Sequence, residues 1–330
     1  LPILTPPTLG IYELRVSFTQ GRAHIPAVRG VSLVVAPGEC VAVVGESGSG
    51  KTQLFMAAMG LLPGSAAVDG RVRFEDEDIL GAPPERLNRI RGARLTMVFQ
   101  DPMTSLTPHL KIGIQLAEVL VCHAGMSWSE AGAAARRMLE RVRVPDPQHR
   151  LNQYPHELSG GLRQRVMIGM SLLCDPKLLI ADEPTTALDV TVQAQIIDLL
   201  RAMREEIGMA LVLISHDLSV VAGLADRILV MYAGRIVESA STVELFAGAR
   251  HPYTAALLKC VPGLSGPPLA RWPTLPGQPP RPQDSERGCA FAPRCSWAEE
   301  RCRAQRPMLQ EAGGARAVGA AALVACHFPL

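Results

Sequence analysis

The stretch that decides the fold runs from residue 40 to residue 62 and reads CVAVVGESGSGKTQLFMAAMGLL. A short run of β-branched residues leads into glycines and then into a long segment with apolar periodicity, which predicts a strand, a loop and a helix in that order. The loop satisfies the pattern G-x-x-x-x-G-K-S/T, in which backbone N–H groups surround phosphate oxygens and the lysine reaches the β and γ phosphates. The last hydroxyl of the pattern can ligate Mg²⁺. We therefore predict an ATP site with Mg²⁺, formed here by Gly45, Ser47, Gly48, Gly50, Lys51 and Thr52.

The composition around this stretch is that of a globular protein. The chain has 330 residues, 48% of them hydrophobic, which is ample for a buried core. Its 33 Lys and Arg against 31 Asp and Glu leave a net charge of +2, too small a field to gather nucleic acid or anionic lipid. No apolar run approaches the roughly 18 to 20 residues that span a bilayer, and no secretory signal is recognisable. We expect a cytosolic protein that binds no nucleic acid.

Two short apolar runs, KLLIADEP at residues 177–184 and ALVLISHD at residues 210–217, have the residue types of strands buried on both faces of a parallel sheet. Asp182 stands at the carboxyl end of the first run, where open α/β sheets place their ligands. We expect it to hold Mg²⁺, directly or through water. Glu183, one residue further, is placed to orient or deprotonate the water that attacks the γ phosphate.

The rest of the chain divides by its patterns. Residues 11–35 alternate as half-buried strands do, and DRILVMYAGRIVES predicts a hairpin turning at Ala233-Gly234. Between residues 100 and 158 the strand pattern vanishes, and a capping box of Ser127 and Glu130 predicts a helix there. After about residue 262 a Pro-rich linker, expected to be extended and partly polyproline II, leads to a cysteine-bearing tail. We predict a nucleotide-binding domain over 1–261, with a helical part at about 101–170, and an extension over 262–330.

At residues 158–162 the chain reads LSGGL, followed by RQRVMIGMSLL shortly before the LLIADEP strand. This segment resembles the signature of ABC-type ATPases, and the resemblance covers about residues 11–238. It implies an α/β P-loop NTPase fold of ABC type, with a mostly parallel core sheet, an N-terminal antiparallel β subdomain, a helical signature subdomain and a small C-terminal extension. Leu162 departs from the glutamine that many of these proteins carry. We expect this change to be tolerated, because the phosphate-facing work falls to Ser159, Gly160 and Gly161.

The resemblance also assigns roles to single residues. The signature serine, glycines and helix N-terminus suit an anion, and in the family they contact the nucleotide held by the opposite subunit. ATP would then join two ATPase subunits, and hydrolysis would let them separate. By the resemblance Gln100 senses Mg²⁺ and water, His216 contacts the γ phosphate, Phe18 stacks on adenine, and Asp189 lies in the loop after the catalytic strand. The implied catalytic residues are Glu183, His216 and Gln100, and the implied Mg²⁺ ligands are Thr52, Gln100 and Asp182.

Finer similarity narrows the kind of ABC protein. MVFQDPMTSLTPHLKIG at residues 97–113, HPYTAALL at 251–258, and the tail segments GCAFAPRC and VACHFP look like the ATPases of bacterial oligopeptide and dipeptide importers. This implies peptide import at the cytoplasmic side of the inner membrane, with two permease subunits and a solute-binding protein. A heterodimer with a second ATPase subunit is expected, with a homodimer as the alternative. Nickel, opine or glutathione cargo stays open, as does a soluble non-transport ABC ATPase.

The tail carries four cysteines, three of them within GCAFAPRCSWAEERC. Scattered structural thiols are one interpretation of them. Disulfides are disfavoured in a reducing cytosol, and one Zn²⁺ ion usually takes its sulfurs from tight C-x2-C pairs. The spacing matches neither of the common ferredoxin patterns. The importer resemblance nevertheless implies a 4Fe-4S iron–sulfur cluster that pins the tail, with Cys289, Cys295, Cys302 and Cys326 as its ligands.

Overall fold

The computed structural model describes residues 6–21, 23–101, 105–186, 188–261, 275–281, 287–311 and 322–330. Most of the predicted polyproline linker lies outside these residues. The contacts of the chain divide it into two compact units. The first comprises Leu1–Leu9, Val35–Glu39 and Phe74–Ile214, and the second comprises Gly10–Val34, Cys40–Arg73 and Ser215–Leu330. The G-x-x-x-x-G-K-S/T loop and the cysteine-bearing tail therefore belong to the same unit.

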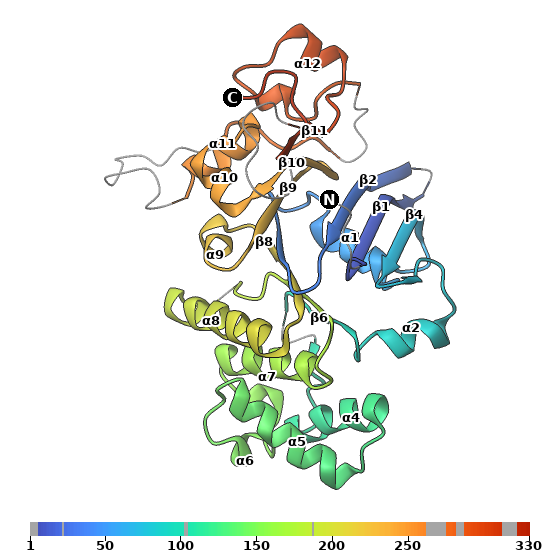
Figure 1. The fold of residues 1–330 in the computed structure, drawn as a ribbon, viewed down its shortest axis with the longest axis vertical. Helices are drawn as coiled ribbons and strands as arrows, with labels where there is room; N and C mark the ends of the chain where they lie inside the picture. Colours follow the sequence, from blue (N-terminus) through green and yellow to red (C-terminus); the bar gives the residue numbers. More distant parts are fainter. Residues whose placement is uncertain are drawn as a thin grey trace. The chain divides into compact units, whose positions relative to one another are not determined.

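The first unit is built on three parallel strands in the order β8-β7-β6, of which β8 and β6 are labelled in Figure 1. They are β6 (Leu95–Val98), β7 (Leu178–Asp182) and β8 (Ala210–Ser215). Every residue of β7 and β8 is buried, as the continuous apolar runs predicted. Leu178 of β7 pairs with Leu95 on one side and Ala210 on the other, so the carboxyl ends of the strands lie at one edge.

Helices make up most of the rest of the first unit, and α4, α5 and α7 pack on one another. The predicted capping box is confirmed: the Ser127 hydroxyl accepts from the Glu130 N–H, and the Glu130 carboxylate accepts from the Ser127 N–H. The helices are α2 (Pro84–Ile90), α4 (Ile112–Ala124), α5 (Trp128–Arg141), α6 (Pro147–Arg150), α7 (Gly160–Leu172) and α8 (Val190–Ile207), with a 3-10 turn η1 (Pro155–Glu157) and the short strand β5 (Glu77–Asp78).

The second unit carries five strands in the order β11-β12-β10-β9-β3. Strand β3 (Cys40–Val44) runs parallel to β9 (Arg227–Tyr232), and β9 turns back into the antiparallel β10 (Arg235–Ser241). The predicted hairpin is confirmed, with positive φ at both turn residues, Ala233 and Gly234. The tail joins this sheet because β12 (Leu323–Val324) pairs with β10 and with β11 (Gln310–Glu311).

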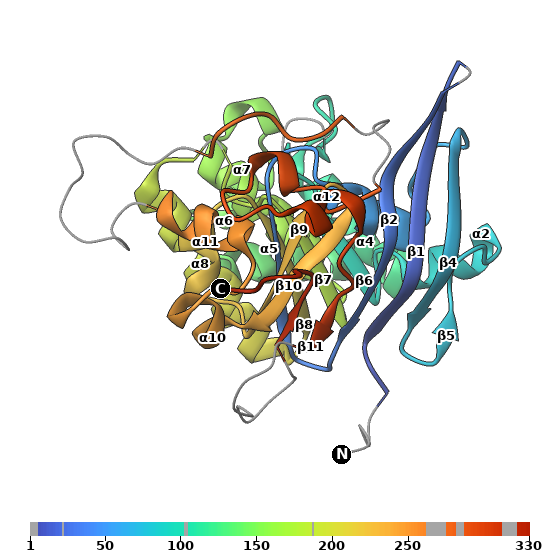
Figure 2. The ribbon, with the colours of Figure 1, turned by 90° about the horizontal axis from the view of Figure 1, so that it is seen from above.

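The predicted N-terminal strands form a second sheet in this unit, in which β2 (Ala23–Val35), β1 (Leu9–Gln20) and β4 (Ala66–Phe74) lie side by side (Figure 2). Its remaining elements are helices α1 (Lys51–Ala58), α9 (Leu218–Ala222), α10 (Thr242–Ala247), α11 (Pro252–Lys259) and α12 (Glu300–Ala304), with a 3-10 turn η2 (Ala292–Arg294). None of the helices in the described ranges is both long and apolar enough to cross a bilayer.

Candidate functional site

The G-x-x-x-x-G-K-S/T loop connects β3 to α1, as the order of strand, loop and helix predicted. Lys51 is the first residue of α1 and is buried. Its ammonium donates to the carbonyl oxygens of Gly45 at 2.8 Å and Glu46 at 3.0 Å. Neutral carbonyls hold the lysine without cancelling its charge. The ammonium is therefore held at the loop as a cation that can pair with phosphate.

Two glycines of the loop are required by packing as well as by phosphate approach. A Cβ on Gly45 would lie 2.2 Å from the Met231 carbonyl oxygen of β9. Gly50 has φ 98°, and a Cβ there would lie 2.4 Å from the Ala27 carbonyl oxygen of β2. Only glycine fits such close approach of two backbones. The loop therefore rests directly on the strands beside it.

Glu46 occupies a position of the motif that accepts any residue, so the pattern predicts no role for it. In the structure its N–H donates to the Tyr253 hydroxyl of α11 at 2.9 Å. Its carboxylate pairs with the guanidinium of Arg294 in the tail. Tyr253 and Arg294 are thus supports of the loop that the motif did not indicate, although they lie in the segments HPYTAALL and GCAFAPRC, on which the importer resemblance rests.

The other predicted residues of the second unit occupy separate elements. Phe18 is half-buried on β1, Thr52 lies in the first turn of α1, and His216 is exposed directly after β8. Ser47 and Gly48 lie within the loop itself. The roles implied for Phe18 in adenine stacking and for His216 at the γ phosphate stay predictions.

The first unit brings Gln100 and Glu183 together. Glu183 follows Asp182 at the carboxyl end of β7, and its φ of 46° lies in the left-handed region that side chains rarely adopt. Its Oε2 atom accepts from the Gln100 side-chain amide at 2.9 Å and from the Thr186 hydroxyl at 2.9 Å. Thr186 escaped the sequence interpretation. Glu183 is thus held in one orientation by two side-chain donors on a strained backbone.

The signature residues stand at the start of α7. Ser159 is the N-cap of this helix, and its hydroxyl makes no capping hydrogen bond. A Cβ on Gly161 would lie 2.9 Å from Val192 Cγ1, so this glycine permits close packing against α8. Asp189 caps α8, because its Oδ1 atom accepts from the Val192 N–H at 3.0 Å. A serine hydroxyl and a helix N-terminus side by side suit an anion.

Each of the predicted Mg²⁺ ligands carries a chemically suitable donor atom. Asp182 offers a buried carboxylate, 1% exposed, and Thr52 offers a hydroxyl. The Gln100 nitrogen donates to Glu183, which leaves the amide oxygen as the atom for a metal. Hard oxygen donors of this kind are what Mg²⁺ prefers. Thr52 belongs to the second unit, and the other two belong to the first.

The predicted iron–sulfur cluster is wrong. Across the described ranges, including residues 287–311 and 322–330, no group of three or more His, Cys, Asp or Glu side chains could hold a metal ion. The thiols line a cavity of only about 20 Å³, the space of about one water molecule. Burial raises the pKa of Cys289 to about 11 and also raises the pKa of Cys295 and Cys326, which disfavours the thiolates that ligate metals. The residues this correction concerns are Cys289, Cys295, Cys302 and Cys326.

Apolar packing holds the tail that the cluster was expected to pin. Phe291 of the tail is 4% exposed and packs on the rings of Tyr232, Tyr253 and His251, with centroids 5.5, 5.4 and 5.9 Å away. Such aromatic pairs contribute about 0.5–1.5 kcal/mol each beyond their buried area. Together with the pairing of β12 and β10, this cluster attaches the tail to the second unit without a metal.

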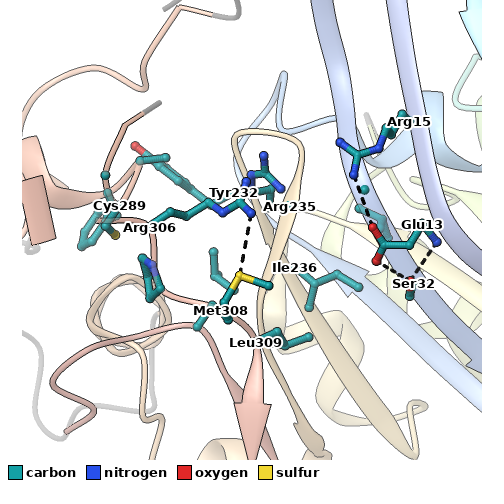
Figure 3. Close-up of a pocket in the computed structure, with 18 residues that line it drawn as sticks. Glu13, Arg15, Ser32, Tyr232, Arg235, Ile236, Cys289, Arg306, Met308 and Leu309 are labelled. Atoms are coloured by element: carbon teal, nitrogen blue, oxygen red, sulfur yellow. Dashed lines mark hydrogen bonds and ion pairs between the residues drawn. The ribbon is translucent and has the colours of Figure 1, made fainter. Parts of the chain in front are cut away.

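A separate cavity of about 310 Å³ lies beside this cluster in the second unit (Figure 3). Tyr232 and Arg235 of the β9–β10 hairpin face Arg306 and Met308 of the tail across it. Among the described residues that line the cavity, none belongs to the G-x-x-x-x-G-K-S/T loop. This cavity is therefore not where the loop would place a nucleotide.

Comparison with known proteins identifies two family regions in the chain. The family described as ABC transporter matches residues 28–186, and the family described as Oligopeptide/dipeptide transporter, C-terminal region, matches residues 237–302. The oligopeptide transport ATP-binding protein OppD of Salmonella typhimurium is 48% identical over 300 residues, covering 91% of this chain and 89% of the relative. OppD of Haemophilus influenzae is 47% identical over 296 residues, covering 90% and 91%.

Solved structures agree with this likeness. A dimeric ATP-binding cassette in a post-hydrolysis state, bound to ADP and Pi, superposes with a TM-score of 0.64 at 27% identity, covering 71% of this chain and 98% of that one. The cbiO1 subunit from Clostridium perfringens, part of the ABC transporter complex cbiONQ, reaches a TM-score of 0.62 at 28% identity, covering 73% and 91%. The predicted fold class is confirmed.

Proposed function

Because the chain belongs to the ABC transporter family and carries its oligopeptide/dipeptide transporter C-terminal region, we propose that it is the ATP-hydrolysing subunit that powers peptide import across a cell membrane. One observation carries the proposal: a buried lysine is held by carbonyl oxygens inside a glycine loop that opens a helix. This arrangement suits the phosphates of ATP. Both relatives described above are named oligopeptide transport ATP-binding proteins, and these names favour peptides as the cargo.

The second unit binds the nucleotide. Backbone N–H groups between Gly45 and Thr52 surround the phosphates, Lys51 pairs with the β and γ phosphates, and Phe18 stacks on adenine. Thr52, Asp182 and Gln100 would hold Mg²⁺, which when bound would neutralise part of the phosphate charge. Each of these contacts favours ATP as the ligand of the loop.

The chemical step is assigned to Glu183. Glu183 accepts a proton from water as the water oxygen bonds to the γ phosphorus and the bond to the bridging oxygen of ADP breaks. The hydrogen bonds from Gln100 and Thr186 orient the Glu183 carboxylate for this role. His216 contacts the γ phosphate. The products are ADP and inorganic phosphate.

A second ATPase subunit completes each site. The sequence contains one G-x-x-x-x-G-K-S/T loop and one LSGGL segment. Ser159, Gly160 and Gly161 therefore act on the nucleotide that the partner binds, and Asp189 belongs to the loop after the catalytic strand. We expect the partner to be a related but distinct ATPase chain. We also expect two permease subunits and a solute-binding protein in the complete transporter, with the ATPase subunits on the inner face of the membrane. Co-purification of the complete transporter from its host tests this, and a single kind of ATPase chain in it would contradict the heterodimer.

The proposal is tested with the complete transporter in proteoliposomes. Peptides presented with the solute-binding protein should be taken up and should raise ATP hydrolysis well above that of the isolated chain, because assembly places a signature segment against each γ phosphate. The matched controls are nickel, an opine and glutathione at the same concentrations. Uptake of one of these controls in place of peptides would overturn the peptide assignment. Full activity of the isolated chain at any dilution would overturn the shared site.

A further inference from the structure

Arg294 of the tail makes a bidentate ion pair with Glu46, which is 248 residues away in sequence. Glu46 belongs to the G-x-x-x-x-G-K-S/T loop, Gly45 to Thr52, which is called the phosphate loop below. Its Nη1 donates to Glu46 Oε2 at 2.7 Å and its Nη2 donates to Oε1 at 2.9 Å. The Arg294 side chain is 4% exposed and the Glu46 side chain is 27% exposed, so water screens this pair little. Bidentate pairs between arginine and a carboxylate combine charge with fixed geometry.

The guanidinium is held on its other sides as well. Its Nε donates to the Pro276 carbonyl oxygen at 2.8 Å, and Nη1 also donates to the Tyr232 hydroxyl at 3.2 Å. The rings of Tyr232 and Phe291 lie under it, with centroids 5.9 and 6.0 Å away. The hydrogen bond with Glu46 raises the pKa of Arg294, so it stays charged. Arg294 is therefore a fixed cation beside the loop.

Glu46 sets both the charge and the shape of the phosphate loop. A carboxylate in a loop that binds a polyphosphate repels the ligand unless a cation offsets it. The carbonyl of the same residue accepts from Lys51 Nζ, and its N–H donates to the Tyr253 hydroxyl. A displaced Glu46 would therefore also displace an acceptor of the lysine that meets the phosphates.

We propose that Arg294 is a positioning residue for nucleotide binding, which offsets the charge of Glu46 and holds the loop in its phosphate-binding shape. The tail is then part of the nucleotide site, and its docking sets how tightly the loop binds ATP. This inference rests on the proposed function of Gly45 to Thr52 as the phosphate loop. The proposal differs from a simple mechanical tether in a measurable way. A tether weakens equally when either partner is neutralised, whereas an offset charge gives opposite effects.

The experiment compares four variants of the full chain: Arg294→Met, Glu46→Gln, the double variant, and Arg301→Met as the matched control. Arg301 is an exposed arginine of α12 in the same tail. Dissociation constants for Mg-ATP and Mg-ADP are measured by calorimetry, after circular dichroism confirms folding. We expect Arg294→Met to weaken ATP binding by about tenfold, and ADP binding by less, because ATP carries one more negative charge.

The companion variants should move the other way. Glu46→Gln should bind ATP at least as tightly as the wild type, since its amide keeps the contact and the guanidinium charge is no longer offset. The double variant should bind ATP more tightly than Arg294→Met. If Arg294→Met does not fold, Arg294→Gln replaces it, since a shorter amide can occupy part of the same space without charge, and the same loss is expected.

Two results would overturn the inference. One is ATP affinity in the Arg294 variant equal to that of Arg301→Met. The other is a loss in Glu46→Gln as large as the loss in Arg294→Met, which would make the pair a tether only. A wild-type chain that binds no ATP would instead overturn the phosphate-loop assignment, and with it the site that Arg294 is proposed to position.

Discussion

The phosphate loop of the second unit and Glu183, the proposed catalytic carboxylate of the first unit, are held in place by different kinds of contact. The loop glycines lie against neighbouring backbone, where Gly45 meets the Met231 carbonyl and Gly50 meets the Ala27 carbonyl, and side chains support the loop only further along, at Glu46. Glu183 instead depends on two side-chain hydrogen bonds, from Gln100 and Thr186. The proposed roles in nucleotide binding and in hydrolysis therefore rest on separate sets of supporting residues.

This difference predicts how the two regions respond to substitution. Backbone contacts leave no room for an added side chain, so changes at the loop glycines act on folding and binding together. Side-chain contacts to a carboxylate can be removed one at a time. Substitutions around Glu183 should therefore change turnover and leave nucleotide affinity nearly unchanged.

The largest expected effect is that of Glu183→Gln. The amide keeps the size and polarity of the side chain but cannot accept the proton, so turnover should fall by about 10³-fold. ATP should still bind, and the closed dimer should accumulate. Hydrolysis rates and ATP dissociation constants are measured beside Glu205→Gln, an exposed glutamate of α8 as control. A large loss of ATP affinity in Glu183→Gln would show that the two regions are not separate.

Lys51→Ala should show the converse. The variant removes the cation that meets the phosphates in both ground and transition states, so ATP affinity should fall by about 10²-fold. Lys259→Ala, at the exposed end of α11, is the matched control for loss of a lysine. Equal affinity losses in Lys51→Ala and Glu183→Gln would mean that the two roles have been assigned wrongly.

The sequence alone predicted the parts of this site that depend on residues close to one another in the chain. The glycine loop, the β7 strand that ends at Asp182, and the hairpin at Ala233-Gly234 all follow from patterns within about ten residues. The partnership of Gln100 with Glu183 lay beyond these patterns, although both residues had been named. The spacing of residues within a motif does not predict contacts between segments that are distant in sequence.

The contacts that the sequence left hidden are those between distant segments. Arg294 and Glu46 are 248 residues apart, and the motif accepts any residue at position 46. The cysteines of the tail misled for a related reason. The importer resemblance implied a metal cluster on them, whereas the folded tail buries Phe291 among aromatic rings and keeps Cys289 as a half-buried thiol with a raised pKa. Burial decides between these interpretations, and burial is a property of the fold.

Acid should loosen the support of the loop through His251. Burial lowers the pKa of His251 to about 4, while its Nδ1 atom accepts from the N–H of Tyr253, the residue that meets Glu46. The unfolded chain takes up a proton below about pH 6.5 and the folded chain does not. This contribution to stability is therefore full above pH 6.5 and is lost as the pH falls toward 4, by about 2 kcal/mol between pH 7 and pH 5.

The measurement is urea unfolding at pH 7 and pH 5 for the wild type and for His251→Asn, which keeps a capping acceptor without titrating. Burial raises the pKa of the neighbouring Glu238, which gives a slope of the opposite sign. Because both proteins contain Glu238, the difference between them isolates the histidine. Equal pH slopes in the two proteins would show that His251 is not protonated on unfolding.

The smallest expected effect concerns the second donor to the catalytic carboxylate. Thr186→Val keeps the shape of the side chain but removes the hydroxyl that donates to Glu183 at 2.9 Å. A hydrogen bond of this kind contributes about 1 kcal/mol, so kcat in the assembled transporter should fall about fivefold with KM unchanged. Thr186→Ser keeps the hydroxyl and should restore most of the rate. If KM rises instead while kcat is unchanged, Thr186 supports nucleotide binding. That result would contradict the proposed separation between the residues that support binding and those that support hydrolysis.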